Sequence, residues 1–408
     1  MQVEQSLWTE TNGWQPSPLG KLGDQAQLVL LFGSPAVLKL DRYTQPLRQA
    51  YPKAQMLGCS TAGEICGVQV TDESLVATAI HFEHTQIRGQ AIRLEAGETS
   101  LAVGDRLGQL IEPEGLAHVL LLSDGLHVNG SDLVRGILPH LPEGVTVTGG
   151  LSGDGDRFQE TFVLWNGAPE QNTIAALGLY GDRLQVGYGS QGGWSPFGPE
   201  RVITKSDGNV LYELDGQPAL ELYKKYLGDH AEGLPATGLL FPLSLQTQTG
   251  DRRIVRTILS VDEAAQSLTF AGDVPMGITA QLMHSNVDRL IDGAIEAAET
   301  SHQAMEVAPE LAILISCVGR KLLMRQRIEE EVEGVRDVLG KETVLAGFYE
   351  PVSEDNRVKG DFGHLVIPSV TDWIDKNPLL KWGTVAGALI GVSAMAIAAQ
   401  VFNQDRGA

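Results

Sequence analysis

The chain has 408 residues with a formal net charge of -21 at pH 7, and 43% of its residues are hydrophobic. This length exceeds what one ordinary hydrophobic core supports, so we expect two domains and an appendage. The acidic balance argues against a nucleic-acid partner, because phosphates are bound by a basic face. Three cysteines are too few for a disulfide framework and fit a reducing compartment inside the cell.

The first half of the chain alternates short apolar runs with polar turns. The runs predict strands at 28–32, 54–57, 74–82, 86–94, 119–122, 145–148, 162–165, 173–180 and 184–188. Strands 74–82 and 86–94 are expected to pair as a hairpin, and the last three strands to form a β-meander. Helical spacing marks 101–111. A second helix, capped by Ser131, lies between 119–122 and 145–148 and makes a βαβ crossover.

After a loop-like stretch at Gly189–Gly198, the second half repeats this alternation. We expect helices near 218–227, 287–298 and 320–339, and strands at 253–261, 267–270, 311–315 and 343–345. Both halves contain a strand, a short polar turn, a helix and a strand that stops at glycine. The sequence therefore predicts an α/β fold of mixed sheets with βαβ units. Two related domains, 25–205 and 206–369, would lie side by side.

The C-terminal segment has a different composition. Residues 382–402 carry no charge, and a helix of about 20 residues covers roughly 30 Å, the thickness of a bilayer core. Lys376 and Lys381 precede it, no secretory signal is recognised at the N-terminus, and the positive-inside rule then keeps the body cytoplasmic. We predict a juxtamembrane connector at 370–381 and a single-pass C-terminal membrane helix at 382–402. The alternative is an apolar helix packed on the protein.

Four polar or glycine-rich turns follow the carboxyl ends of predicted strands: Gly58–Glu64, Ser123–Gly125, Gly149–Gly155 and Ser316–Arg320. Ligands bind at this edge of open α/β sheets, where backbone amides and helix N-termini converge. The alternative for each turn is simple chain reversal. The candidate ligand-binding residues in these turns are Cys59, Ser60, Thr61, Glu64, Ser123, Asp124, Gly125, Gly150, Ser152, Asp154, Cys317 and Arg320.

Particular side chains suggest particular chemistry. A cysteine at a helix N-terminus has a lowered pKa and could be a nucleophile, so Cys59 and Cys317 are candidates, or else buried packing residues. Arg320 could hold a carboxylate or pair with neighbouring acids. Asp124 and Asp154 could receive an ammonium group or cap turns. The chain lacks the phosphate-binding GxxxxGK pattern and any metal-ligand spacing, so we expect no cofactor, no metal and no catalytic residue.

Several motifs, in order, resemble those of the FIST family. Leu57–Ile65, Ser123–Gly125 and Gly149–Asp154 resemble the FIST N-terminal domain, and Gly189–Trp194 with Val210–Gly216 resembles the junction to the FIST C-terminal domain. Ser316–Arg320 and Ala346–Tyr349 resemble later FIST C motifs. The resemblance implies a sensory module of intracellular signal transduction that binds a small ligand such as an amino acid, and it adds Trp194 to the candidates. After Tyr349 the chain departs from the family pattern.

Three functions follow from these observations. The first is a ligand-sensing module, anchored to a membrane, that signals through a separate output protein. The second is an enzyme with Cys59 or Cys317 as nucleophile. The third is a ligand-free membrane scaffold whose small tail residues Gly383, Gly387 and Gly391 drive homo-oligomerisation.

Overall fold

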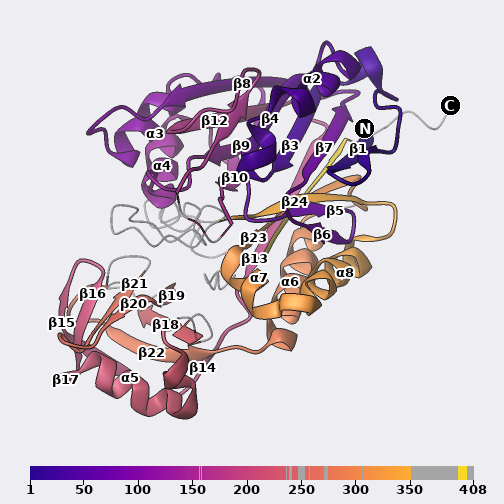
Figure 1. Ribbon diagram of the computed structural model, residues 1–408. Coiled ribbons are helices and arrows are strands. Elements are labelled where there is room, and N and C mark those ends of the chain that lie inside the picture. Colours follow the sequence, from indigo (N-terminus) through magenta and orange to yellow (C-terminus); the bar gives the residue numbers. More distant parts are fainter. Residues whose placement is uncertain are drawn as a thin grey trace.

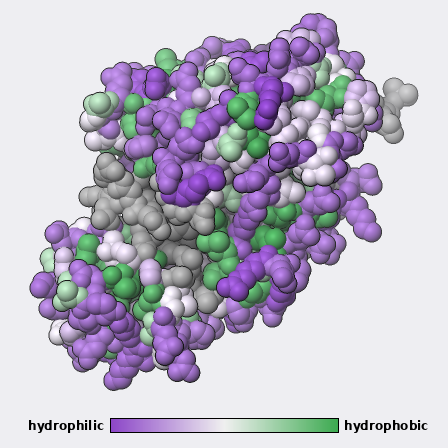
Figure 2. Space-filling view, in the orientation of Figure 1, coloured by the Kyte–Doolittle hydropathy of each residue, from purple (hydrophilic) through white to green (hydrophobic). Residues whose placement is uncertain are grey.

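The computed structural model describes residues 1–155, 157, 159–235, 237–238, 241–246, 253–256, 258–270, 274–305, 307–350 and 394–401. The mixed α/β class predicted from the sequence is confirmed. A body of three sheets and their helices carries a small β-rich lobe, at the lower left of Figure 1. The face shown in Figure 2 is largely hydrophilic, with apolar residues in small patches.

The first sheet of the body has the strand order β11-β4-β3-β7-β1-β2. Its strands are β1 (Gln2–Thr9), β2 (Gly13–Gln15), β3 (Leu28–Gly33), β4 (Gln55–Ser60), β7 (Leu75–His81) and β11 (Val163–Trp165). A 3-10 turn (Gly23–Gln25) precedes β3, and helices α1 (Pro35–Leu38) and α2 (Asp41–Ala50) follow it. The helices pack Val37, Leu38 and Leu47 on one face of this sheet.

The second sheet has the order β10-β9-β12-β8. Its strands are β8 (Gln86–Arg93), β9 (Leu116–Ser123), β10 (Thr146–Leu151) and β12 (Thr173–Tyr180). Helices α3 (Ser100–Gly108) and α4 (Gly130–Ile137), the latter extended by a 3-10 turn (Leu138–His140), cover one face. Strands β9 and β10 are parallel, which confirms the predicted crossover. The N-cap of α4 is Asn129, two residues before the predicted Ser131.

The third sheet has the order β13-β25-β23-β24-β5-β6. Its strands are β5 (Glu64–Cys66), β6 (Gln69–Thr71), β13 (Leu184–Gln191), β23 (Leu311–Cys317), β24 (Val344–Glu350) and β25 (Ala394–Val401). Helices α6 (Val287–Gln303), α7 (Val318–Met324) and α8 (Ile328–Leu339) pack on one face. Strands from both predicted domains therefore share this sheet.

The prediction of a single helix over 320–339 is wrong, because the helix is interrupted at Arg325. Arg325 has φ 49°, a left-handed conformation, and a 3-10 turn (Arg325–Arg327) separates α7 from α8. The break places Glu329, Glu330 and Glu331 in the first turn of α8. Acidic residues there complement the helix dipole, which a single helix beginning with four basic residues would oppose.

The hairpin and the meander predicted from local alternation are also wrong. Strand β7 pairs with β3 and β1, whereas β8 pairs with β12 in another sheet. The successive strands β11, β12 and β13 lie in three different sheets. Alternation indicates that one face of a strand is buried, but it carries no information on which strand lies beside it.

One core joins the three sheets. Leu30 of β3, Leu122 of β9 and Ile313 of β23 belong to a single buried cluster, while alternate residues of the same strands face the helices. These strands are buried on both faces, which explains their continuous apolar runs.

The small lobe runs from Ser195 to His284 and has its own core. Its elements are β14 (Ser195–Pro196), β15 (Arg201–Asp207), β16 (Val210–Leu214), β17 (Gln217–Pro218), α5 (Ala219–Leu227), a 3-10 segment (Gly228–Gly233), β18 (Leu243–Gln246), β19 (Arg253–Arg256), β20 (Ile258–Asp262), β21 (Ser267–Phe270) and β22 (Thr279–His284). The buried cluster of the lobe contains only residues between Phe197 and Leu282. The boundary predicted at 205/206 falls inside β15.

The C-terminal prediction needs a correction. Residues 394–401 form β25, antiparallel to both β13 and β23, in place of the end of the predicted helix. A gap between two strands can be filled by an apolar segment whose backbone groups pair on both sides. Residues 370–393 and 402 of the predicted connector and anchor lie outside the described residues. Among the described helices, none has the length and apolar character required to cross a bilayer.

Candidate functional site

The predicted convergence of the turns is present in the structure. Gly153 N donates to Ser60 O at 2.7 Å, Ser152 N donates to Ser123 O at 2.8 Å, and Ala62 N donates to Tyr349 O at 2.7 Å. The ends of β4, β9, β10 and β24 thus meet in one place, which we call the turn junction. Gly150 lies so close to β23 and β24 that a Cβ there would be 2.8 Å from Ile315 Cγ2.

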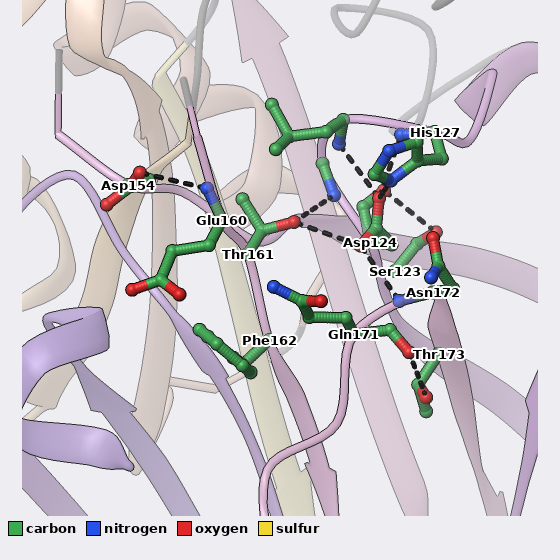
Figure 3. Close-up of polar contacts among 12 residues, drawn as sticks. Ser123, Asp124, His127, Asp154, Glu160, Thr161, Phe162, Gln171, Asn172 and Thr173 are labelled. Atoms are coloured by element: carbon green, nitrogen blue, oxygen red, sulfur yellow. Dashed lines mark hydrogen bonds and ion pairs between the residues drawn. The ribbon is translucent and has the colours of Figure 1, made fainter. Parts of the chain in front are cut away.

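Asp124 organises one side of the junction (Figure 3). Its Oδ1 accepts hydrogen bonds from the backbone N–H groups of Leu126 and His127, and its Oδ2 accepts from Thr161 Oγ1 and Asn172 N. Burial acts to raise the pKa of Asp124, but the hydrogen bond and charge of His127 and the backbone donors outweigh it and lower that pKa. Asp124 therefore holds its own loop together.

Asp154 uses its carboxylate in the same way. Oδ1 accepts from Arg157 Nε at 2.8 Å, and Oδ2 accepts from the backbone N–H groups of Gln159 and Glu160, each at 3.1 Å. The side chain is 2% exposed. Both aspartates predicted to receive an ammonium group are thus engaged with neighbouring chain segments.

The hydroxyl groups of the junction are also largely used inside the protein. Ser60 Oγ donates to Gly153 O at 2.7 Å and accepts from Phe162 N, Gly125 N donates to Thr161 Oγ1, and Ser123 Oγ donates to the Asp124 carbonyl. The Ser152 hydroxyl is buried without a hydrogen-bond partner among the described residues.

Glu64 is a fully buried carboxyl beside the junction. Its Oε1 accepts from Thr61 Oγ1, and its Oε2 accepts from Ser74 N and Ser74 Oγ at 3.2 and 2.6 Å. Burial raises the pKa of Glu64 to about 7, against the opposing hydrogen bonds from Ser74 and Thr61. Glu64 therefore titrates near neutral pH.

The two candidate nucleophiles lie inside the protein. Cys59 belongs to the shared core, and burial together with Glu350 and Glu64 raises the pKa of its thiol well above the usual value. Cys317 caps α7 by accepting from Gly319 N at 3.1 Å, yet burial raises the pKa of its thiol to about 12. Both thiols are protonated at neutral pH in this structure, whereas a nucleophile must be a thiolate.

Arg320 has no exposed surface and its guanidinium is occupied. It donates to Glu331 Oε1 from Nε at 2.8 Å and from Nη2 at 2.5 Å, to Gly192 O from Nη1 at 3.0 Å, and to Leu290 O from Nη2 at 2.6 Å. The sequence suggested that Arg320 either holds a carboxylate ligand or pairs with a neighbouring acid, and the structure shows the pair with Glu331.

Trp194, the remaining candidate, lies apart from the junction at the neck of the small lobe, which we define as residues 192–195 and 284–286. A cleft of about 150 Å³ opens there between the loop 191–194, helix α6 and the lobe strands β19 and β22. Its lining residues are Gln191, Gly192, Gly193, Trp194, Val255, Met283, Arg289, Asp292, Gly293 and Glu296. We call it the neck cleft.

The neck cleft combines both charges with an apolar surface. Arg289 Nη1 donates to Ser195 Oγ at 2.6 Å. Asp292 and Glu296 are exposed carboxylates with no hydrogen-bond or ion-pair partner in the described part of the chain. Trp194 and Met283 supply apolar area, and the Trp194 indole N–H is buried with no acceptor among the described residues.

The sequence interpretation missed the charged wall of this cleft. Arg289, Asp292 and Glu296 follow one another at helical spacing, which places them on one side of α6. That spacing is present in the sequence, on a helix whose clearest signal is its apolar face. Glu331 and Glu350, which contact Arg320 and the Leu151 amide respectively, were also missed.

Comparison with known proteins places these features in a family context. A family model described as the FIST N domain matches residues 27–217, and one described as the FIST C domain matches residues 219–350. An uncharacterized protein of Methanocaldococcus jannaschii is 22% identical over 336 residues, covering 76% of this chain. The chain spans only 64% of the length of that relative.

An uncharacterized protein of Mycobacterium tuberculosis is 24% identical over 327 residues, covering 75% of this chain and 82% of the relative. Among solved structures, a cyanuric acid hydrolase from A. caulinodans aligns with 78% of this chain and all of its own, at 11% identity and a TM-score of 0.17. That score is too low to bear on the fold.

Proposed function

Because the chain belongs to the FIST family, whose domains are associated with sensing in signal transduction, we propose that it is a sensory module and that its ligand binds in the neck cleft. One observation carries the choice of site: the charged side chains of the cleft include groups without internal partners, whereas Asp124 and Asp154 of the turn junction are hydrogen-bonded to neighbouring chain segments. A ligand gains most where it supplies a missing partner.

The arrangement of charge suits a free amino acid. Arg289 can hold an α-carboxylate through paired donors, and Asp292 and Glu296 can accept hydrogen bonds from an ammonium group. The faces of Trp194 and Met283 then contact the side chain of the ligand. A cleft of about 150 Å³ holds a molecule of this size.

The position of the cleft between the body and the lobe would let ligand binding change the orientation of the lobe. Its walls belong partly to the body, through α6, and partly to the lobe, through Val255 and Met283. The two parts have separate cores and are connected at the neck. A ligand that contacts both parts favours one lobe orientation in proportion to its differential affinity. A separate output protein would then read that orientation.

Thermal-shift measurements with the standard amino acids at millimolar concentration test the proposal. A ligand at 100 times its dissociation constant stabilises the native state by about 2.7 kcal/mol, a clear rise in Tm. Glu296→Gln and Arg289→Gln should abolish the shift. Glu299→Gln, an exposed acid on the same helix outside the cleft, is the matched control and should keep it. If no amino acid raises the Tm of the wild-type chain, the proposal fails.

Membrane attachment through 382–402 stays a prediction, since 382–393 and 402 lie outside the described residues and 394–401 form β25. The sensing function proposed for the neck cleft does not require it. Separation of soluble and membrane fractions of cells expressing the full chain would test attachment directly.

A further inference from the structure

Arg320 donates hydrogen bonds to two segments that form the neck cleft, the loop at Gly192 and helix α6. Nη1 donates to the carbonyl of Gly192, a residue that lines the cleft. Nη2 donates to the carbonyl of Leu290, which follows Arg289 in α6. One buried guanidinium thus fixes the loop that enters the lobe against the helix that leaves it.

Glu331 and Tyr349 hold this guanidinium in place. Glu331 Oε1 accepts from Arg320 Nε and Nη2, and Glu331 Oε2 accepts from Tyr349 Oη at 3.1 Å. Each of these three residues is at most 1% exposed. Buried hydrogen bonds to charged groups are strong and directional, and they cannot be replaced by water without opening the structure.

The backbone of Tyr349 continues the connection to the turn Gly58–Glu64. Tyr349 N donates to Gly63 O at 2.9 Å, and Ala62 N donates to Tyr349 O at 2.7 Å. Lys321, the residue after Arg320, donates from Nζ to Ala62 O at 2.9 Å. The neck cleft and this glycine-rich turn are therefore the two ends of one chain of hydrogen bonds.

We propose that Arg320, Glu331 and Tyr349 form a relay that makes the neck cleft and the turn Gly58–Glu64 one cooperative unit. Arg320 is a positioning residue in this scheme, because it sets the cleft walls without contacting the ligand. Loss of one link loosens both ends, and a ligand that tightens the cleft also tightens the turn. The regulatory use of the relay rests on the proposed sensing function, but the mechanical link does not.

Hydrogen exchange of the full-length, ligand-free chain tests the relay. Tyr349→Phe keeps the ring and removes only the bond to Glu331. We expect exchange to become about fivefold faster, the equivalent of one hydrogen bond, in peptides covering both 61–67 and 189–195. Tyr223→Phe is the matched control, since Tyr223 is also buried and donates to the Phe241 carbonyl within the lobe. It should accelerate exchange in the lobe alone.

Two results would overturn the relay. One is faster exchange at 61–67 in Tyr349→Phe with wild-type rates at 189–195. The other is the same effect on 189–195 from Tyr223→Phe. Glu331→Gln, which keeps the side-chain volume but removes the charge facing Arg320, should accelerate exchange at both ends more than Tyr349→Phe. Failure to find an amino-acid ligand would defeat the proposed function while leaving this ligand-free comparison decisive.

Discussion

A Cβ atom on Gly293 would lie 2.9 Å from the backbone nitrogen of Gly193, so helix α6 and the neck loop touch backbone to backbone. Gly193 itself has φ 71° and would bring a Cβ within 2.3 Å of the Arg289 carbonyl. The floor of the neck cleft therefore requires glycine on both sides.

We expect Gly293→Ala to displace the neck loop. Overpacking of this kind costs about 1–3 kcal/mol, which exceeds the gain of about 1 kcal/mol from better helix propensity. Gly334→Ala in α8 is the comparison, because its Cβ would meet side-chain atoms, Ile295 Cγ1 at 2.8 Å and Cδ1 at 2.9 Å, which can shift more easily than backbone. Urea unfolding should show a larger loss for Gly293→Ala than for Gly334→Ala; equal losses would contradict the backbone contact.

For the buried ion pair between Arg320 and Glu331, we expect the stability losses of the two single variants to be strongly non-additive. Arg320→Met leaves the Glu331 carboxylate buried without its countercharge, and removal of one partner of such a pair costs about 3–5 kcal/mol. The double variant Arg320→Met with Glu331→Leu removes both charges and should be more stable than Arg320→Met. A double-mutant cycle by urea unfolding measures the coupling. Additive losses would show that the pair contributes no interaction energy.

Glu64 predicts a pH dependence of unusual sign for an acid. Its folded-state pKa of about 7 lies above the unfolded value, so between about pH 4.5 and 7 the native state binds more protons and its stability falls as pH rises. The shift corresponds to an effect on the order of 3 kcal/mol. Buried His118, whose pKa is lowered to about 3 by burial, acts in the opposite direction over part of this range.

Comparison with Glu64→Gln isolates the contribution of Glu64 from that of His118. The free energy of unfolding of the wild type, minus that of Glu64→Gln, should fall steadily from pH 5 to pH 7.5 when both are measured by urea titration. A difference that is constant with pH would mean that Glu64 does not change protonation in this range.

The cysteines should differ in reactivity by exposure. Cys66 is partly exposed, although burial raises the pKa of its thiol to about 11, whereas Cys59 and Cys317 are buried. A maleimide at pH 7.5 should label Cys66 first and the other two only when urea unfolds the chain. Cys66→Ser then leaves a native protein that resists labelling. Rapid labelling of Cys59 or Cys317 in that variant would instead favour a nucleophilic role.

Removal of β25 should damage the third sheet. This strand pairs with β13 on one side and β23 on the other, so deletion of 394–408 leaves two strands of the body without a partner between them. We expect a lower Tm and association of the truncated chain, measured by calorimetry and light scattering. A stable monomer with an unchanged Tm would show that the body folds without this segment.

The sequence allowed much of the local structure to be predicted and little of its pairing. Buried strands such as β3, β9 and β23 were evident as apolar runs, and the glycine turns were correctly expected to meet. Partners of β7 and β8 could not be predicted, because three sheets share one core and each strand finds its neighbour far along the chain. The break at Arg325 escaped notice because neither glycine nor proline marks it.

For the candidate site too, some features could be predicted from the sequence and others required the fold. Residue types correctly indicated which turns converge, but not that Asp124, Asp154 and Arg320 have their hydrogen-bonding groups engaged within the protein. Whether a charged group is available to a ligand depends on groups distant in sequence, such as Glu331 for Arg320. The spacing on α6 could have shown one wall of the neck cleft, while Val255 and Met283 of the opposite wall required the fold.

The antiparallel pairing of Ser195 with His284 means that the chain enters and leaves the small lobe at one point. An insertion with adjacent ends leaves the path of its host unchanged. The lobe can thus be replaced as a unit, by another domain during evolution or by a fluorescent reporter in the laboratory, while the three-sheet body continues from β13 to α6.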